Sequence, residues 1–105
     1  MKAERKKNEI IKFLNLYIKK ITDDPKIIIS VLDVNVPTKK GVMNIYLSIF
    51  PEKYIKEVIM LLEQEEKKLK KILKSFKILR YLPKKIYFYN IGNLKLLEEI
   101  DKILK

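Results

Sequence analysis

The longest stretch of this 105-residue chain without glycine or proline runs from Glu52 to Leu82. Apolar residues recur in it at helical spacing, in two consecutive stripes: Tyr54, Ile55, Val58, Ile59 and Leu62, then Leu69, Ile72, Leu73 and Phe76. A single helix over residues 52–79 would be roughly 40 Å long, whereas a compact domain of this size is roughly 26–30 Å across. We therefore predict two helices with a bend near Gln64–Lys67, where Glu65 and Glu66 interrupt the apolar stripe.

The residues before this stretch predict a helix followed by two strands. An apolar helical stripe over residues 3–22 contains Ile10, Phe13, Leu14, Tyr17, Ile18 and Ile21, and Pro25 ends it. Residues 27–36 are β-branched and apolar on both faces at their start, which predicts a central strand covered on more than one side. After the turn 37–41, inward residues Met43, Ile45, Leu47 and Ile49 alternate with Asn44, Tyr46 and Ser48. This alternation predicts a second strand, paired with the first as an antiparallel hairpin.

The residues after Leu82-Pro83 predict a third strand and a short final helix. In residues 84–89, Ile86 and Phe88 lie on one face and Tyr87 and Tyr89 on the other. After a turn at 90–93, the helical stripe contains Leu94, Leu97, Ile100 and Leu104. The core order αββααβ, built from amphipathic elements, predicts one two-layer α+β domain over residues 1–105. It is the order of a type II KH domain, a nucleic-acid-binding fold.

The charge is strongly positive and concentrated in one segment. The chain carries a net charge of +11, and residues 67–85 contain nine basic residues and no acid. On a helical wheel the lysines of this segment lie opposite the apolar stripe, without a neutralising partner in the sequence. Such a surface would bind phosphates with salt-sensitive, largely sequence-independent affinity. The candidate RNA-binding residues are Lys67, Lys70, Lys71, Lys74, Lys77, Arg80, Lys84, Lys85 and Arg5. The alternatives are an ordinary solvated helix face and a lysine-rich composition throughout the chain.

Two further features leave alternatives open. Tyr46, Tyr87 and Tyr89 are expected to share one sheet face, where aromatic rings can stack on bases or be covered by a terminal helix. Arg5, together with Lys6 and Lys7, extends the basic footprint if the first helix begins beside it; otherwise these residues form a frayed, solubilising terminus.

The residue types argue against an enzyme. The chain has no cysteine and no histidine, so thiolate and imidazole chemistry are absent, and we expect no metal and no cofactor. The carboxylate pairs Asp23-Asp24 and Glu65-Glu66 are adjacent in sequence and project in different directions. With only Gly41 and Gly92, there is no glycine-rich phosphate loop. No apolar run reaches the ~20 residues of a membrane span. We therefore expect a cytoplasmic protein with no membrane partner and no small-molecule substrate.

Five segments are informative when they are taken together. They are Asp24-Pro25 after the first helix; the strand–turn–strand segment Val36–Tyr46; Asn44-Ile45-Tyr46-Leu47-Ser48; Leu79-Arg80-Tyr81-Leu82-Pro83 with the aromatic strand Ile86-Tyr87-Phe88-Tyr89; and Leu96-Leu97 in the closing helix. In combination they resemble the ribosome-binding factor A family, in which Lys-Val-Tyr-Val-Ser stands at the place of residues 44–48. The resemblance covers nearly the whole chain in order and length. It implies a KH-like factor that binds the immature small (30S) ribosomal subunit and its 16S rRNA, aids late processing of that rRNA, and leaves before translation.

The sequence departs from the family pattern at three places. The family's Ala-x-Gly, at the bend between its second and third helices, aligns with Glu65-Glu66-Lys67, so this bend cannot rely on glycine. A hairpin-turn Asp aligns with Lys39, and a small Ala of the second strand aligns with Met43. Our interpretation is a monomeric, non-enzymatic ribosome-biogenesis factor that docks on rRNA electrostatically. Its rivals are a stand-alone KH-type binder of another RNA, a basic module for an acidic protein partner, and a membrane-surface protein.

Overall fold

Helix α1 and the three strands form where the hydrophobic patterns predicted them. The computed structural model describes residues 2–35, 39–75, 79 and 81–91. In it, α1 spans Lys2–Ile21, β1 Ile28–Asn35, β2 Val42–Phe50 and β3 Lys85–Asn90. The predicted stripe of α1 faces the core through Ile10, Leu14 and Ile18, all of which are buried. The predicted final helix, residues 94–104, lies outside the described residues.

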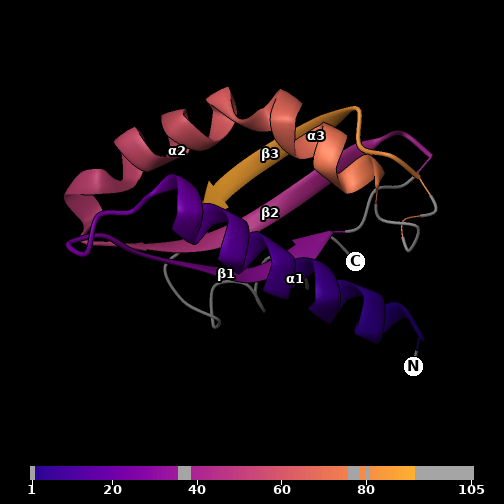
Figure 1. The fold of residues 1–105 in the computed structure, drawn as a ribbon, viewed down its shortest axis with the longest axis horizontal. Helices are drawn as coiled ribbons and strands as arrows, with labels where there is room; N and C mark the ends of the chain where they lie inside the picture. Colours follow the sequence, from indigo (N-terminus) through magenta and orange to yellow (C-terminus); the bar gives the residue numbers. More distant parts are fainter. Residues whose placement is uncertain (1, 36–38, 76–78, 80, 92–105) are drawn as a thin grey trace.

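The long stretch without glycine or proline forms two helices, as predicted. A 3₁₀ turn at Glu52–Tyr54 leads into α2 (Ile55–Gln64), and α3 (Glu66–Lys74) follows after one intervening residue, Glu65. Figure 1 shows α3 turning away from the direction of α2. Glu65 has φ −87° and ψ 0°, a conformation that is open to residues with a side chain. The bend therefore forms in the right-handed region of backbone space and requires no glycine.

The three strands form one sheet in the order β1-β2-β3. β1 pairs with β2 antiparallel, with a bulge between Val31 and Asp33, and β2 pairs with β3 in parallel. In the described part of the chain β1 is therefore an edge strand, and the prediction of a central, doubly covered strand was wrong. The apolar residues at the start of β1 suggested that both faces of the strand are covered. Ile28, however, lies on the face that the helices do not cover and is exposed. The central strand is β2.

Helices α1, α2 and α3 lie on the same face of the sheet (Figure 1), and the main core fills the space between them and the strands. Helix α1 packs mainly on β1, and α2 on β3. The core takes the predicted inward residues of β2 and β3: Met43, Ile45, Leu47, Ile49, Ile86 and Phe88. A smaller cluster of Tyr46, Ile91 and Leu32 lies on the opposite face. The result is the predicted two-layer α+β architecture.

Gly41 connects the beginnings of β2 and β3. Its φ of +75° is a conformation that residues with a Cβ rarely adopt. A Cβ there would also meet Cγ of Lys84 at 2.8 Å. The Gly41 carbonyl accepts hydrogen bonds from the backbone N–H groups of Lys84 (2.6 Å) and Lys85 (3.1 Å). This turn thereby fixes where the third strand enters the sheet.

Candidate nucleic-acid interface

Helix α3 has one buried side and one cationic side. Leu69 and Leu73 are buried in the core, while three lysines at helical spacing, Lys67, Lys71 and Lys74, are exposed. We call these three residues the lysine ridge. No carboxylate of the described residues lies within ion-pair distance of their amines. Apolar anchoring on one side thus leaves a continuous row of unneutralised positive charge on the other.

Two candidate lysines share one carboxylate partner, contrary to the prediction of a stripe without a neutralising partner. Glu66 is only 9% exposed, and its carboxylate forms ion pairs with the amines of Lys70 at 3.1 Å and Lys85 at 3.2 Å. Its carboxylate also accepts a hydrogen bond from the Ile86 backbone N–H at 3.4 Å. Glu66 therefore ties the start of α3 to the start of β3. The spacing of Glu66 and Lys70, four residues apart on a helix, could have revealed the first pair; the second depends on the tertiary fold.

The surroundings of Glu66 act on its pKa in opposite directions. Burial disfavours the ionised carboxylate and by itself would raise the pKa. The hydrogen bonds from Lys70, Lys85 and the Ile86 N–H outweigh burial, so the pKa lies below its ordinary value of 4.5. Glu66 is a structural anion that holds two lysines in place.

Glu65, at the bend, binds the first helix. The Tyr17 hydroxyl of α1 donates a hydrogen bond to its carboxylate at 3.2 Å. Burial raises the pKa of the Tyr17 hydroxyl, and the hydrogen bond and charge of Glu65 raise it further. The two adjacent glutamates thus point to different partners, as predicted, and together they hold the bend against α1 on one side and β3 on the other.

The remaining candidate residues lie at the edges of this surface or outside the described chain. Lys84 and Lys85 are exposed where β3 begins. Arg5 is exposed near the start of α1, and the neighbouring Lys7 forms an ion pair with Asp33 at 2.8 Å. Figure 1 shows the start of α1 and the end of α3 at the same end of the molecule. Lys77 and Arg80 lie outside the described residues.

The three tyrosines share the sheet face away from the helices, as predicted. The strand register places Tyr89 beside Tyr46, and Tyr87 lies two residues before Tyr89 on β3. Tyr46 is 5% exposed, whereas Tyr87 and Tyr89 are 43% and 44% exposed. The sequence left open whether these rings are covered or accessible. Tyr46 is covered, whereas the rings of Tyr87 and Tyr89 on β3 are accessible.

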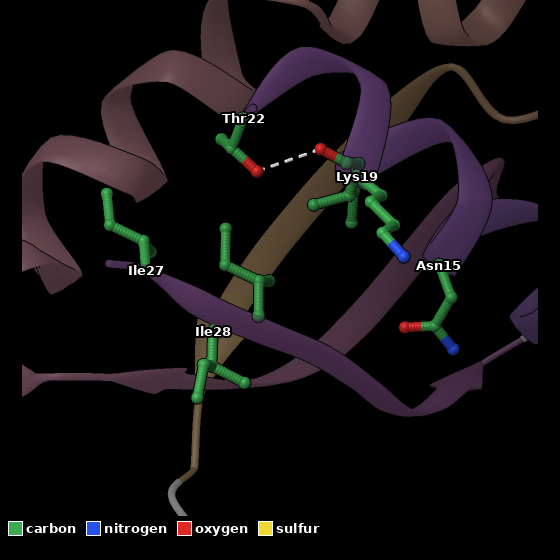
Figure 2. A pocket seen from close by; sticks show the side chains of 7 residues that line it. Asn15, Lys19, Thr22, Ile27 and Ile28 are labelled. Atoms are coloured by element: carbon green, nitrogen blue, oxygen red, sulfur yellow. Dashed lines mark hydrogen bonds between the residues drawn. The ribbon is translucent and has the colours of Figure 1, made fainter. Parts of the chain in front are cut away.

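A cleft of about 340 Å³ lies between the end of α1 and the start of β1 (Figure 2). Its polar groups are largely committed: the Asn15 amide oxygen accepts the Val31 N–H at 2.8 Å, and the Thr22 hydroxyl donates to the Ile18 carbonyl at 2.9 Å. The Lys19 side chain also lines the cleft, without a carboxylate among the lining residues. The cleft therefore holds no pair of groups suited to acid–base chemistry.

The described residues contain neither a cluster of metal ligands nor a helix that could span a membrane. No group of three or more Asp or Glu side chains there is arranged to hold a metal ion. Of the helices in that part of the chain, none combines the length and apolar character that a bilayer span requires.

The element order, the mixed three-stranded sheet and the bent helix pair define a small KH-like domain of type II. Among solved structures, the fold is similar to that of ribosome-binding factor A from Thermus thermophilus, with a TM-score of 0.67. The match covers 86% of this chain and 96% of that chain at 22% sequence identity, and at this identity the likeness shows the fold. No protein-family model matches the chain, and no curated protein matches it in sequence.

Proposed function

We propose that this protein is a cytoplasmic, monomeric ribosome-binding factor that assists late maturation of the small (30S) subunit and processing of its 16S rRNA. One observation supports this proposal above the others. The lysine ridge is exposed, no carboxylate of the described residues pairs with it, and it lies on the third helix of a fold similar to ribosome-binding factor A.

The proposed mechanism is electrostatic docking. Each ridge lysine that approaches a phosphate displaces condensed counterions, and their release drives binding. Lysine acts as a point charge and reads base edges poorly, so the ridge supplies affinity rather than sequence specificity. Binding to one rRNA conformation more tightly than to another shifts the population toward the first. No covalent step is required.

A co-sedimentation experiment tests the proposal. The purified protein is centrifuged with free small subunits, with free large subunits and with whole ribosomes. We expect it to pellet with small subunits alone. Equal pelleting with large subunits, or none with small subunits, would contradict the assignment. Affinity for small subunits should also fall steeply with salt, since each phosphate contact contributes about 0.7–0.9 to the log–log slope; a flat dependence would favour an acidic protein partner.

A charge-reversed variant and a matched control locate the contact. Lys67→Glu, Lys71→Glu and Lys74→Glu together should abolish pelleting and leave the far-UV circular dichroism unchanged. The control reverses three exposed lysines scattered over α1, the following turn and α2: Lys12, Lys26 and Lys56. The change in net charge is the same in both variants. If they bind equally, net charge rather than the ridge determines binding, and the proposed docking surface is wrong.

A further inference from the structure

The outward face of β3 carries an aromatic row that the lysine ridge does not explain. Tyr46 and Tyr89 stack with ring centroids 5.6 Å apart and planes inclined by 23°. Tyr87 continues the row, with its centroid 6.4 Å from that of Tyr89. Tyr87 and Tyr89 expose nearly half of their surface to solvent. By contrast, Ile86 and Phe88, on the other face of the same strand, are buried.

We infer that Tyr87 and Tyr89 form a stacking platform for unpaired bases of an RNA strand whose backbone passes the exposed Lys84 and Lys85 at the start of β3. The inference rests on the proposed function and adds its substrate class: single-stranded rather than duplex RNA. Bases in a duplex are already stacked and paired, so only an unpaired strand can offer their flat faces to a protein ring.

The rings are held in place before any ligand arrives. Tyr46 supports Tyr89 from one side and is itself fixed, because its hydroxyl donates a hydrogen bond of 2.7 Å to the Asn35 side-chain oxygen. A tyrosine ring has two side-chain torsions to order, so little conformational entropy is lost when a base stacks on it. The platform is therefore preorganised on a strand rather than carried on a loop.

Lys85 links the aromatic row to the start of α3. Its amine lies 5.6 Å from the centroid of the Tyr87 ring and 3.2 Å from Oε1 of Glu66, at the start of α3. The side chain thus spans the β3 edge between the helical layer and the outward sheet face. Lys84 is exposed beside it, and β3 contains no acidic residue. A partner that combines negative charge with flat aromatic groups matches both features, which favours a polynucleotide over a protein.

Ring-removing and ring-preserving variants of the full chain test the platform. The probes are a short labelled RNA strand of mixed sequence and the same strand annealed to its complement. Tyr87→Leu with Tyr89→Leu should weaken single-strand binding about tenfold or more. Duplex affinity and the salt slope should stay unchanged, because no phosphate contact is lost. Tyr87→Phe with Tyr89→Phe should keep most of the affinity.

The opposite pattern would overturn the platform. The platform would be wrong if the leucine variant bound the single strand as well as the parent protein does. It would also be wrong if the variant lost as much affinity for the duplex, or if its oligomeric state changed and its affinity did not. The wild-type protein provides a second measurement that needs no variant: the ring signals of Tyr87 and Tyr89 in NMR spectra should shift with the single strand and not with the duplex. The ridge reversal separates the two proposals, because it should weaken binding to both probes while leaving the tyrosines intact.

Discussion

The two sides of α3 carry the same residue type in different roles. Lys70 and Lys71 are neighbours in sequence, yet Lys70 forms an ion pair with Glu66 while Lys71 is exposed with no carboxylate of the described residues beside it. Lys70 neutralises a buried anion and belongs to the structure; Lys71 adds unneutralised charge to the surface. Position relative to Glu66, rather than the number of lysines, therefore determines which of these two cations has a carboxylate partner among the described residues.

The largest effect is expected on the buried side. Leu73 is fully buried, so Leu73→Ala should lower the free energy of unfolding by about 2–5 kcal/mol through lost burial and the cavity left behind. Urea denaturation followed by circular dichroism measures this loss. Met60 of α2 is exposed and serves as the control, since Met60→Ala should stay within about 0.5 kcal/mol of the parent protein. A similar loss in both variants would mean that the effect of Leu73→Ala does not come from the burial of Leu73.

An intermediate effect is expected at Glu66. Glu66→Gln keeps the size of the side chain but removes the ionised acceptor shared by Lys70, Lys85 and the Ile86 N–H. Unfolding free energy should fall by about 1–3 kcal/mol. RNA affinity at low salt should not fall, because the substitution raises the net positive charge. If Glu66→Gln kept its stability but lost RNA binding, Glu66 would contribute to the binding surface and not to the stability of the fold.

The same carboxylate makes stability depend on pH. The folded-state pKa of Glu66 is lowered, so its stabilising contribution is present above the ordinary value of 4.5 and is lost as pH falls through the folded-state pKa. Denaturation of the parent protein and of Glu66→Gln across this acidic range should therefore show their stabilities converging as pH decreases. A constant difference would mean that the folded state does not favour ionised Glu66.

The smallest effects are expected from a matched pair of single substitutions. Lys70→Gln should cost about 0.3–0.5 kcal/mol of stability, the usual value of a helical ion pair at this spacing. Lys71→Gln should leave stability unchanged but reduce the salt slope of RNA binding by about 0.7–0.9. Denaturation and salt titration of both variants measure these two effects. If the two variants behaved identically, Lys70 and Lys71 would not have the different roles described above.

Local patterns were sufficient to predict most of the fold. The bend at Glu65 followed from helix length and from charged residues in an apolar stripe, and the inward residues of β2 and β3 followed from strict alternation. The order of strands in the sheet did not follow, because the apolar run at Ile27–Ile29 is equally compatible with a covered central strand and with an edge strand that exposes Ile28.

The candidate interface was predictable only in part. Exposure of the lysine ridge followed from the helical wheel, since Leu69 and Leu73 fixed which side faces the core. The pairing of Lys85 with Glu66 did not, because these two residues are far apart in sequence and meet only when β3 has joined the sheet. The accessibility of Tyr87 and Tyr89 was not predictable either. It depends on whether another segment packs on the outward face of the sheet, and the alternation of residues along a strand does not reveal this.

The parallel pairing of β3 with β2 has a consequence for how the domain assembles. Val42 and Lys85 are register partners, so the chain between them, including α2 and α3, must be laid across the sheet before the last strand can pair. Closing so long a loop is entropically costly and should occur late. Helix α3 and β3 should then become protected together in a pulse-labelled hydrogen-exchange experiment, after the β1–β2 hairpin. A partly folded molecule would therefore present neither the lysine ridge nor the exposed tyrosines in their native arrangement.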